Sequence, residues 1–236
     1  MHLFPVFLRL QGKRCVVVGA GSVGLAKAEA LAQAGALVTV IDAEPCANLR
    51  ALAARADNVR ILARNFQKHD TRGALLVFAC TSSPEAQAEI ESDAHAGGAL
   101  LCRADDAEAG DFSSAAVLRR GTLCVAVSSG GASPALAARA RDAVAETVGE
   151  EYGRAAELLA HMRTLLRATP SSQAQRATAL RSVLERGLVQ LLREGRSAEA
   201  EALVAEAATR AAAEPLDDGQ SATTRETMSE VDPCTA

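Results

Sequence analysis

The sequence predicts an α/β fold built on a parallel sheet, followed by a small α+β region and a helical C-terminal domain. Three observations support this prediction. In the first half of the chain, short apolar runs alternate with Ala- and Leu-rich stretches, which is typical of a parallel sheet covered by helices. Two further apolar runs then flank a turn-like break. From Ala135 to Ala213 nearly all of the chain favours helix.

Five apolar runs are predicted to form the sheet, because each is short, rich in Val, Ile and Leu, and bounded by turn-forming or polar residues. Before them, Phe4–Leu10 alternates loosely and is predicted to be a short edge strand. The five strands are expected at Arg14–Val18, Leu37–Ile41, Val59–Ala63, Leu75–Cys80 and Ala99–Cys102.

Helices are predicted between these strands. The first covers Gly21–Ala34 and is closed by Gly35, since glycine often follows the last turn of a helix. Further helices are expected at Asn48–Ala54 and Pro84–Ala96. The short connections between strands and helices favour a sheet with helices on its faces.

The pattern changes after Phe112. Ala115–Leu118 and Leu123–Ser128 are predicted strands of a hairpin around the break Arg119–Thr122. Ser133 and the proline after it then open a helix, with proline at the first helical position. The region is too short to form a core of its own and carries apolar strands that need covering, which predicts a homodimer.

The helical region is expected to break near Gly153, at Thr169–Ser172 and at Gly195–Ser197. The last 23 residues are polar and without periodicity, and are predicted to be disordered. Four parts follow: a sheet domain at 1–112, a dimerisation region at 113–150, a helical domain at 151–213 and an acidic tail at 214–236.

Composition and charge limit the function. With 236 residues, of which 49% are apolar, the chain can form one large or two small domains. The net charge is −4, and the tail alone carries six acidic residues and one basic residue, or −5, which leaves about +1 for the rest. No nucleic-acid binder is expected from this balance, because such domains carry a strong basic excess. An anionic small substrate remains compatible with it.

Cysteine and histidine patterns predict no metal site. The six cysteines form no CxxC pair, and none of the four histidines has a partner at ligand spacing. Cys15, Cys80, Cys102 and Cys124 lie in apolar runs and are expected to be small buried thiols. There is no signal-peptide pattern, and no apolar run approaches the roughly 18 residues of a membrane span. A soluble cytoplasmic protein with no membrane partner is therefore expected.

A glycine motif follows the first strand. The residues from Gly19 through Gly21 to Gly24 read G-x-G-x-x-G, and the second strand ends in Asp42, 23 residues after Gly19. The first glycine permits a tight turn, the second lets the backbone approach a pyrophosphate, and the third lets the helix pack close to the sheet. The free N–H groups of the helix N-terminus would bind the phosphates. This context predicts a Rossmann-type dinucleotide-binding domain.

Asp42 favours NAD over NADP as the cofactor. Its carboxylate can accept hydrogen bonds from the ribose hydroxyls and would repel a 2′-phosphate. Thr81 ends the fourth strand at the carboxyl edge of the sheet, where ligands bind in such folds. Two interpretations of Thr81 stay open: a contact to the cofactor, or a hydroxyl that caps the next helix.

A set of short motifs is spread over about residues 3–150, and the most specific of them is the string from Val127 to Pro134. The motifs are Pro5-Val6-Phe7-Leu8-x-Leu10, Cys15 to Val23, Ala26-Lys27-Ala28, Thr81 with its strand, Cys102-x-x-x-Asp106-Ala107, Phe112, and Val127-Ser-Ser-Gly-Gly-Ala-Ser-Pro134 with Leu136 and Arg141. With these motifs the sequence resembles the family of precorrin-2 dehydrogenase and sirohydrochlorin ferrochelatase, the siroheme synthase N-terminal module.

The resemblance implies NAD-dependent oxidation of precorrin-2 to sirohydrochlorin, in some members also insertion of Fe²⁺ or handling of Co²⁺, and an interlocked homodimer. By position, Asp106 matches the family's catalytic aspartate, with Asp105 as the adjacent rival. A carboxylate suits this chemistry, because a ring proton must pass to a base. By position, Ser22, Val23, Ala43 and Glu44 match the NAD-contacting backbone. Ser128, Ser129, Gly130 and Arg141 are predicted to bind the substrate, whose carboxylates require arginines and backbone N–H groups nearby.

The sequence also departs from the family. Ala115 stands where many members have proline, Gln87 stands for an asparagine, and the segment between Asp106 and Phe112 is one residue shorter. Arg119, Arg120 and Arg139 join Arg141 as candidates for the substrate's carboxylates, although ordinary surface positions fit each of them. Two other functions stay open: an NAD-dependent dehydrogenase of another small substrate, and an NAD-sensing module without catalysis.

Overall fold

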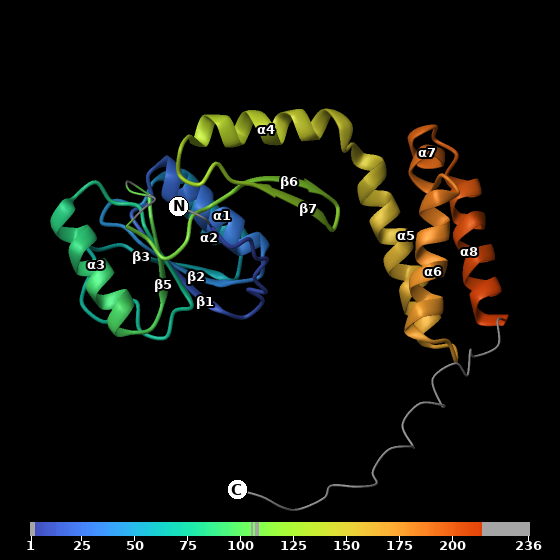
Figure 1. The fold of residues 1–236 in the computed structure, drawn as a ribbon. Coiled ribbons are helices and arrows are strands. Elements are labelled where there is room, and N and C mark those ends of the chain that lie inside the picture. Colours follow the sequence, from blue (N-terminus) through green and yellow to red (C-terminus); the bar gives the residue numbers. More distant parts are fainter. Residues whose placement is uncertain (1–2, 105, 107–108, 214–236) are drawn as a thin grey trace, which may run out of the picture. The chain divides into compact units, whose positions relative to one another are not determined.

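A five-stranded parallel sheet forms the centre of the first half of the chain (Figure 1). The computed structural model describes residues 3–104, 106 and 109–213. The strand order is β3-β2-β1-β4-β5, which is the classic Rossmann order 3-2-1-4-5-6 without its sixth strand. All five predicted strands are confirmed: β1 is Arg14–Val18, β2 is Leu37–Ile41, β3 is Val59–Leu62, β4 is Leu76–Ala79 and β5 is Leu100–Arg103.

Helices cover both faces of this sheet, which explains why its strands are apolar on both sides. α1 (Ser22–Gln33) and α2 (Ala47–Arg55) pack on one face, where Leu31 and Leu49 contact the side chains of alternate strand residues. α3 (Pro84–Ala96) packs on the other face through Ile90 and Ala94. The predicted helices in this part of the chain are thus confirmed.

The register brings the carboxyl ends of the central strands together. Val18 at the end of β1 lies between Ile41 of β2 and Ala79 of β4. The chain runs outward from β1 to β3 and then crosses back to β4, so the strand order reverses between β1 and β4. Ligands bind at such a reversal, outside the carboxyl ends of the strands.

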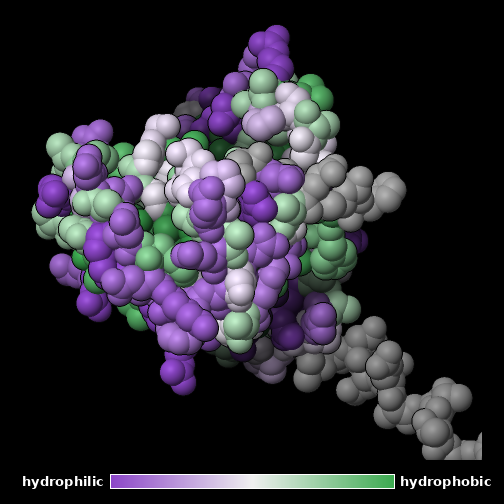
Figure 2. Space-filling model, turned by 90° about the vertical axis from the view of Figure 1, so that its left-hand side faces the viewer, coloured by the Kyte–Doolittle hydropathy of each residue, from purple (hydrophilic) through white to green (hydrophobic). Residues whose placement is uncertain are grey.

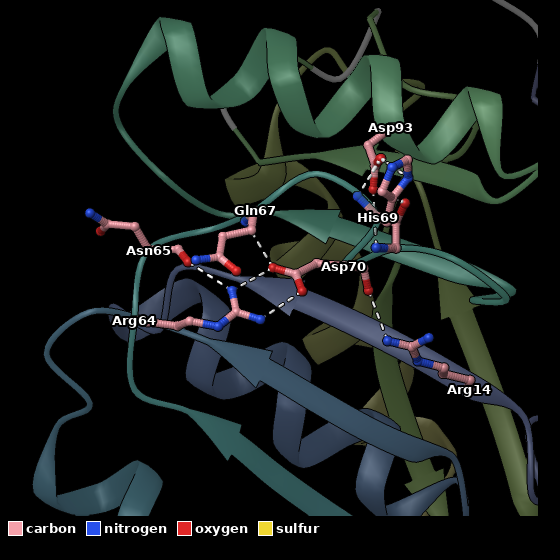
Figure 3. Close-up of polar contacts among 8 residues, drawn as sticks. Arg14, Arg64, Asn65, Gln67, His69, Asp70 and Asp93 are labelled. Carbon is pink, nitrogen blue, oxygen red and sulfur yellow. Dashed lines mark hydrogen bonds and ion pairs between the residues drawn. The ribbon is translucent and has the colours of Figure 1, made fainter.

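The crossover from β3 to β4 consists of turns without a helix, and a charge network holds it (Figure 3). The Arg64 guanidinium donates to both carboxylate oxygens of Asp70, each at 2.7 Å. The hydrogen bond from Arg64 lowers the pKa of Asp70, and the Gln67 N–H lowers it further against the effect of burial. Arg14, at the start of β1, donates to the backbone carbonyl of Asp70 at 2.8 Å.

Asp93 on α3 anchors the other end of this crossover. Its carboxylate accepts hydrogen bonds from the His69 N–H, the Thr71 N–H and the Thr71 hydroxyl. Burial raises the pKa of Asp93, but these three donors outweigh that effect and leave the pKa below its ordinary value. His69 has a left-handed backbone, with φ of 76°, a conformation that is uncommon for a residue with a side chain. The hydrogen bond to Asp93 holds it there.

The edge strand expected at Phe4–Leu10 does not form. The segment has no regular secondary structure, and its residues are exposed apart from Leu10. Pro5 has no backbone N–H to donate to a neighbouring strand. The loose alternation of apolar residues therefore does not reflect a buried face of the sheet.

The chain divides into two compact units. The first comprises Met1–Ala116 with Ala126–Arg141, and the second comprises Val117–Val125 with Asp142 onward. The predicted hairpin is confirmed as β6 (Ala116–Arg120) paired with β7 (Leu123–Val127). The predicted break at Arg119–Thr122 is too long, because Arg119 and Arg120 belong to β6 and the turn comprises only residues 121–122. The proline-started helix is α4 (Pro134–Thr147).

The second unit is a small helical bundle with its own core. Met162, Leu166, Val183 and Leu188 are fully buried in it. A capping box begins its second helix, in which Ser172 and Gln175 satisfy each other's backbone N–H groups. The helices are α5 (Glu150–Arg167), α6 (Gln173–Glu185), α7 (Leu188–Arg193) and α8 (Ser197–Ala213).

One predicted helix break is wrong. Gly153 lies inside α5, which begins after Gly149. A Cβ at Gly153 would lie 2.8 Å from the backbone carbonyl of Arg120. Glycine is therefore needed here so that the backbone of the β6–β7 hairpin can pack against α5. The break between α6 and α7 was not predicted; it falls at Gly187, with φ of 89°.

The face of the molecule in Figure 2 is largely hydrophilic, with separate hydrophobic patches. Among the described residues, no helix combines the length and the apolar character needed to cross a membrane. The disorder expected for the tail at 214–236, and the roles weighed for Asp105 and Ala107, concern positions outside the described residues.

Candidate dinucleotide and substrate site

The glycine motif forms the turn between β1 and α1, and each glycine has its own geometric reason. Gly19 has φ of 87°, and a Cβ on it would lie 2.6 Å from the Cys80 carbonyl oxygen at the end of β4. A Cβ on Gly24 would lie 1.9 Å from the Gly19 carbonyl oxygen. By contrast, a Cβ on Gly21 would meet no atom within 4 Å. The first and third glycines are thus required for packing, and Gly21 faces open space.

The open space beside Gly21 fits a dinucleotide pyrophosphate. Gly21 is the N-cap residue of α1, and in the described part of the chain no side chain caps this helix. Ser22 is exposed and Val23 is 50% exposed, so a ligand can reach the first turn. Uncapped backbone N–H groups and the helix dipole together make this end of α1 suited to bind phosphate.

Asp42 reaches from the end of β2 to the glycine turn. Its Oδ2 accepts from the Ala20 N–H at 2.6 Å, and its Oδ1 accepts from the Glu44 N–H at 2.8 Å. The sequence suggested only a ribose ligand, whereas the structure shows that Asp42 also orders the turn. Each carboxylate oxygen can accept a further hydrogen bond, so a ribose hydroxyl can still bind. Ala43 and Glu44 are exposed beside it.

Thr81 follows β4 and contacts the segment that begins α3, but Ser83 and not Thr81 caps that helix. Ser83 is the N-cap and accepts from the Ala86 N–H at 3.2 Å, while the Thr81 hydroxyl accepts from the Ser83 N–H at 3.3 Å. Gln87 is almost fully buried and donates from Nε2 to the Thr81 carbonyl at 2.7 Å. Gln87 therefore fixes the loop at the strand reversal, a positioning role that the sequence did not indicate.

The loop that follows β5 carries Asp106 and folds back on that strand. Asp111 accepts from the Leu101 N–H at 2.8 Å and donates its own N–H to the Leu101 carbonyl at 2.8 Å. Phe112 packs edge-on against Phe78, with ring centroids 5.3 Å apart. Asp106 itself is exposed and accepts from the Ala109 N–H at 3.3 Å. The structure thus places an exposed carboxylate three residues past the end of β5.

The Ser128–Pro134 loop is ordered by its own hydroxyls. Ser129 Oγ donates to the Ser133 carbonyl at 2.9 Å and accepts from the Ser133 N–H at 3.0 Å. Ser128 Oγ accepts from the Gly130 N–H at 3.1 Å. Gly130 and Gly131 both have positive φ, which explains two adjacent glycines at this point.

A cavity of about 400 Å³ lies within the first unit, where these segments meet. Its lining begins at Val23 on α1, continues over the ends of β4 and β5, and is closed by residues 113–116 and the Ser128–Pro134 loop. Of the predicted substrate residues, Ser128 and Ser129 line it. Among the described residues the lining includes neither Gly130 nor Arg141, and Asp106 lies outside it.

Two thiols in the cavity wall are kept neutral by their surroundings. Burial raises the pKa of Cys80 to about 11; the nearby Cys102 adds to this, and the Lys27 ammonium opposes it. Burial also raises the pKa of Cys102. The expected burial of Cys15 and Cys102 is confirmed, whereas Cys80 and Cys124 are only partly buried. In the described parts of the chain no cluster of three or more metal-ligating side chains occurs.

Of the four candidate arginines, Arg120 has a structural partner in the second unit. It donates from Nε to the Val148 carbonyl at 3.1 Å and pairs with Glu150 at 3.3 Å. Arg119 neighbours it on the same strand, β6. Arg139 and Arg141 lie on α4 in the first unit.

Comparison with known proteins agrees with this geometry. Residues 6–116 match a family whose description reads "Putative NAD(P)-binding". The siroheme synthase of Chromobacterium violaceum is 35% identical over 202 residues, which is 86% of this chain and 43% of that protein. The siroheme synthase of Methylococcus capsulatus is 35% identical over 213 residues, or 90% and 44%. Over most of its length the chain is thus similar to siroheme synthases, and residues 6–116 match an NAD(P)-binding family.

A solved structure supports the same fold. The chain resembles "SirC, precorrin-2 dehydrogenase" with a TM-score of 0.71 and 21% identity, over 86% of this chain and all of that one. The Rossmann-type domain with a helical C-terminal region is thereby confirmed, and the family match supports a nicotinamide dinucleotide as cofactor. The chain spans less than half the length of the siroheme synthases it matches.

Proposed function

We propose that this chain oxidises precorrin-2 to sirohydrochlorin with NAD⁺ in siroheme biosynthesis. The observation that carries the proposal is the cavity, which begins at the glycine turn and extends to the Ser128–Pro134 loop. Val23 belongs to both, because it sits in the first turn of α1 and also lines the cavity. A molecule in the cavity would therefore lie next to a dinucleotide bound at that turn.

The residues of the chain have separate tasks in this reaction. The N–H groups of the first turn of α1 hold the pyrophosphate, and Asp42 accepts from the ribose. The bound nicotinamide ring supplies the hydride acceptor. The oxidation removes a hydride and a proton from the substrate, so the proton needs a base, and we assign that role to Asp106. Support comes from its exposed position three residues past β5, the strand whose Cys102 and Arg103 line the cavity.

NAD is proposed in preference to NADP. The Asp42 carboxylate sits at the end of β2, where the adenosine ribose is expected, and its negative charge would repel a 2′-phosphate. Its two hydrogen bonds to the Ala20 and Glu44 N–H groups hold it in this place.

Insertion of Fe²⁺ is a second activity that the same residues could serve. It expels two pyrrole protons, so it requires a proton acceptor near the macrocycle, and Asp106 is the candidate. The names of the relatives, siroheme synthases, favour including it in the test. The iron would be a substrate in this reaction.

The deciding experiment supplies purified protein with precorrin-2 and NAD⁺ and follows the absorbance of the tetrapyrrole and of NADH. Oxidation with equimolar NADH is expected, and Fe²⁺ is added afterwards to look for siroheme. Binding of NAD⁺ without oxidation would favour an NAD sensor. Oxidation of some other small substrate in place of precorrin-2 would favour a different dehydrogenase.

A homodimer is proposed as the functional form. Support comes from large apolar side chains exposed near the N-terminus, with Phe4 at 88% and Phe7 at 71% exposure. Exposed apolar groups of this size are typical of interaction surfaces when they occur together. Light scattering at micromolar concentration is expected to give twice the chain mass, and a stable monomer would refute the dimer.

A further inference from the structure

One basic side chain in the cavity is not explained by the site described so far. Lys27 lies on α1, one turn after Val23, and is only partly exposed. Residues four apart on a helix share a face, so Val23 and Lys27 both point toward the cavity that they line. The sequence singled out Lys27 only as part of a motif, without a role.

Among the described residues of the cavity wall, basic side chains outnumber acidic ones. Lys27 and Arg103 are its two basic residues, and among the described residues that line it there is no aspartate or glutamate. Arg103 pairs with Glu91 at 3.3 Å. Lys27 forms no ion pair and no hydrogen bond with any described residue. Within the described part of the chain, the charge of Lys27 therefore has no counter-ion in this largely apolar wall.

The neighbouring thiols do not supply that counter-ion. A thiolate at Cys80 or Cys102 could pair with Lys27, but burial keeps both pKa values above the ordinary value. Both groups are therefore neutral near pH 7. A partly buried ammonium without a partner is unfavourable, and a bound anion would remove this cost.

We propose that Lys27 binds a carboxylate of the substrate and thereby helps to hold an acidic tetrapyrrole in the cavity. The proposal rests on the proposed function. Two anions could meet Lys27, a substrate carboxylate or the cofactor pyrophosphate. The carboxylate is favoured because Lys27 lies beside Cys80 and Cys102, over β4 and β5, whereas the pyrophosphate belongs to the first turn of α1.

The test compares Lys27→Met with Lys27→Arg and with Lys13→Met. Methionine keeps much of the length of lysine and removes the charge, arginine keeps the charge, and Lys13 is an exposed lysine outside the cavity. Three quantities are measured for each: KM for precorrin-2, Kd for the octacarboxylate uroporphyrin by fluorescence quenching, and Kd for NAD⁺. Circular dichroism and Tm report on folding.

For Lys27→Met we expect KM and the porphyrin Kd to rise by about 10- to 100-fold, the range for a lost hydrogen bond to a charged group. The Kd for NAD⁺ should stay within about twofold, and Lys27→Arg should recover most of the porphyrin affinity. The effect should shrink at high salt, because screening weakens the ion pair. Lys13→Met should match the wild type.

Porphyrin affinity unchanged in a folded Lys27→Met protein would overturn the proposal. So would a rise in the NAD⁺ Kd without a rise in the porphyrin Kd, or an equal loss in Lys13→Met. The porphyrin measurement does not depend on turnover. A wild-type protein that fails to oxidise precorrin-2 would refute the proposed function, while the comparison of porphyrin affinities still decides the role of Lys27.

Discussion

Gly21 and Gly24 lie three residues apart at the start of α1, and substituting each by alanine should separate dinucleotide binding from folding. Gly21→Ala places a methyl group in open space, since no atom lies within 4 Å of the added Cβ. The backbone needs no change, because φ at Gly21 is −61°. Gly24→Ala instead places the methyl group 1.9 Å from the Gly19 carbonyl oxygen. That neighbour is backbone of the strand-to-helix turn and cannot rotate away.

The magnitudes follow from these contacts. Overpacking costs typically ~1–3 kcal/mol and occasionally more, and a contact this short with backbone belongs at the upper end. Alanine recovers up to about 1 kcal/mol of helix propensity. A net loss of roughly 2 kcal/mol in Gly24→Ala corresponds to a fall in Tm of about 4–8 °C at this chain length. Gly21→Ala should stay within about 1 kcal/mol of the wild type, the range of an N-cap change.

The assay is thermal unfolding of each variant together with titration of NAD⁺. Gly21→Ala should keep its Tm and bind NAD⁺ at least about tenfold more weakly, since its methyl group occupies the approach to the pyrophosphate. Gly24→Ala should lose stability first. Wild-type NAD⁺ affinity in Gly21→Ala would refute the placement of the pyrophosphate, and an unchanged Tm in Gly24→Ala would refute the packing argument.

Three further predictions concern carboxylates. Asp106→Asn should lower the rate of precorrin-2 oxidation by about 10²–10⁴ and leave the NAD⁺ Kd unchanged, because the amide cannot accept the proton; a dead Asp105→Asn beside an active Asp106→Asn would show that the wrong aspartate was assigned. Asp42→Ala should weaken NAD⁺ binding and reduce the preference over NADP⁺, as titration of both cofactors would show, and an unchanged preference would contradict the ribose assignment. In the folded state the pKa values of Asp70 and Asp93 are lowered. Both carboxylates therefore stabilise the folded state at pH values above their unfolded pKa of about 4. This stabilisation is lost as the pH falls through the lowered pKa values. Acid unfolding followed by circular dichroism should be less steep in Asp93→Asn, and an unchanged slope would contradict this account.

The sheet and the glycine turn were predictable because their signals are local. Consecutive apolar residues in Arg14–Val18 indicate by themselves a strand that is buried on both faces. The spacing of the glycines that follow indicates the strand-to-helix turn. Phe4–Leu10 carried a similar apolar pattern and forms no strand, because a strand also requires a partner with free backbone groups. The pattern of apolar residues shows that a segment could form a strand, but whether a neighbouring strand is available to pair with it depends on the rest of the fold.

Long-range contacts explain what the sequence did not show. The crossover between β3 and β4 depends on Asp93, which comes more than twenty residues after the His69 N–H that it accepts. Gly153 was interpreted as a helix break, whereas its reason is the backbone of Arg120 in another segment. Gln87 was noted only as a departure from the family, although it fixes the Thr81 carbonyl.

The same distinction applies to the cavity, where the important property is the balance of charge among residues distant in sequence. Thiols beside a hydride acceptor would be a hazard if they ionised, since the thiolate is the reactive nucleophile. Burial raises the pKa of Cys80 to about 11, so the thiol is neutral near pH 7. Because these thiols stay neutral, they do not offset the charge of Lys27, and under the proposed function the same wall keeps a nucleophile away from the cofactor and offers a cation to an acidic substrate.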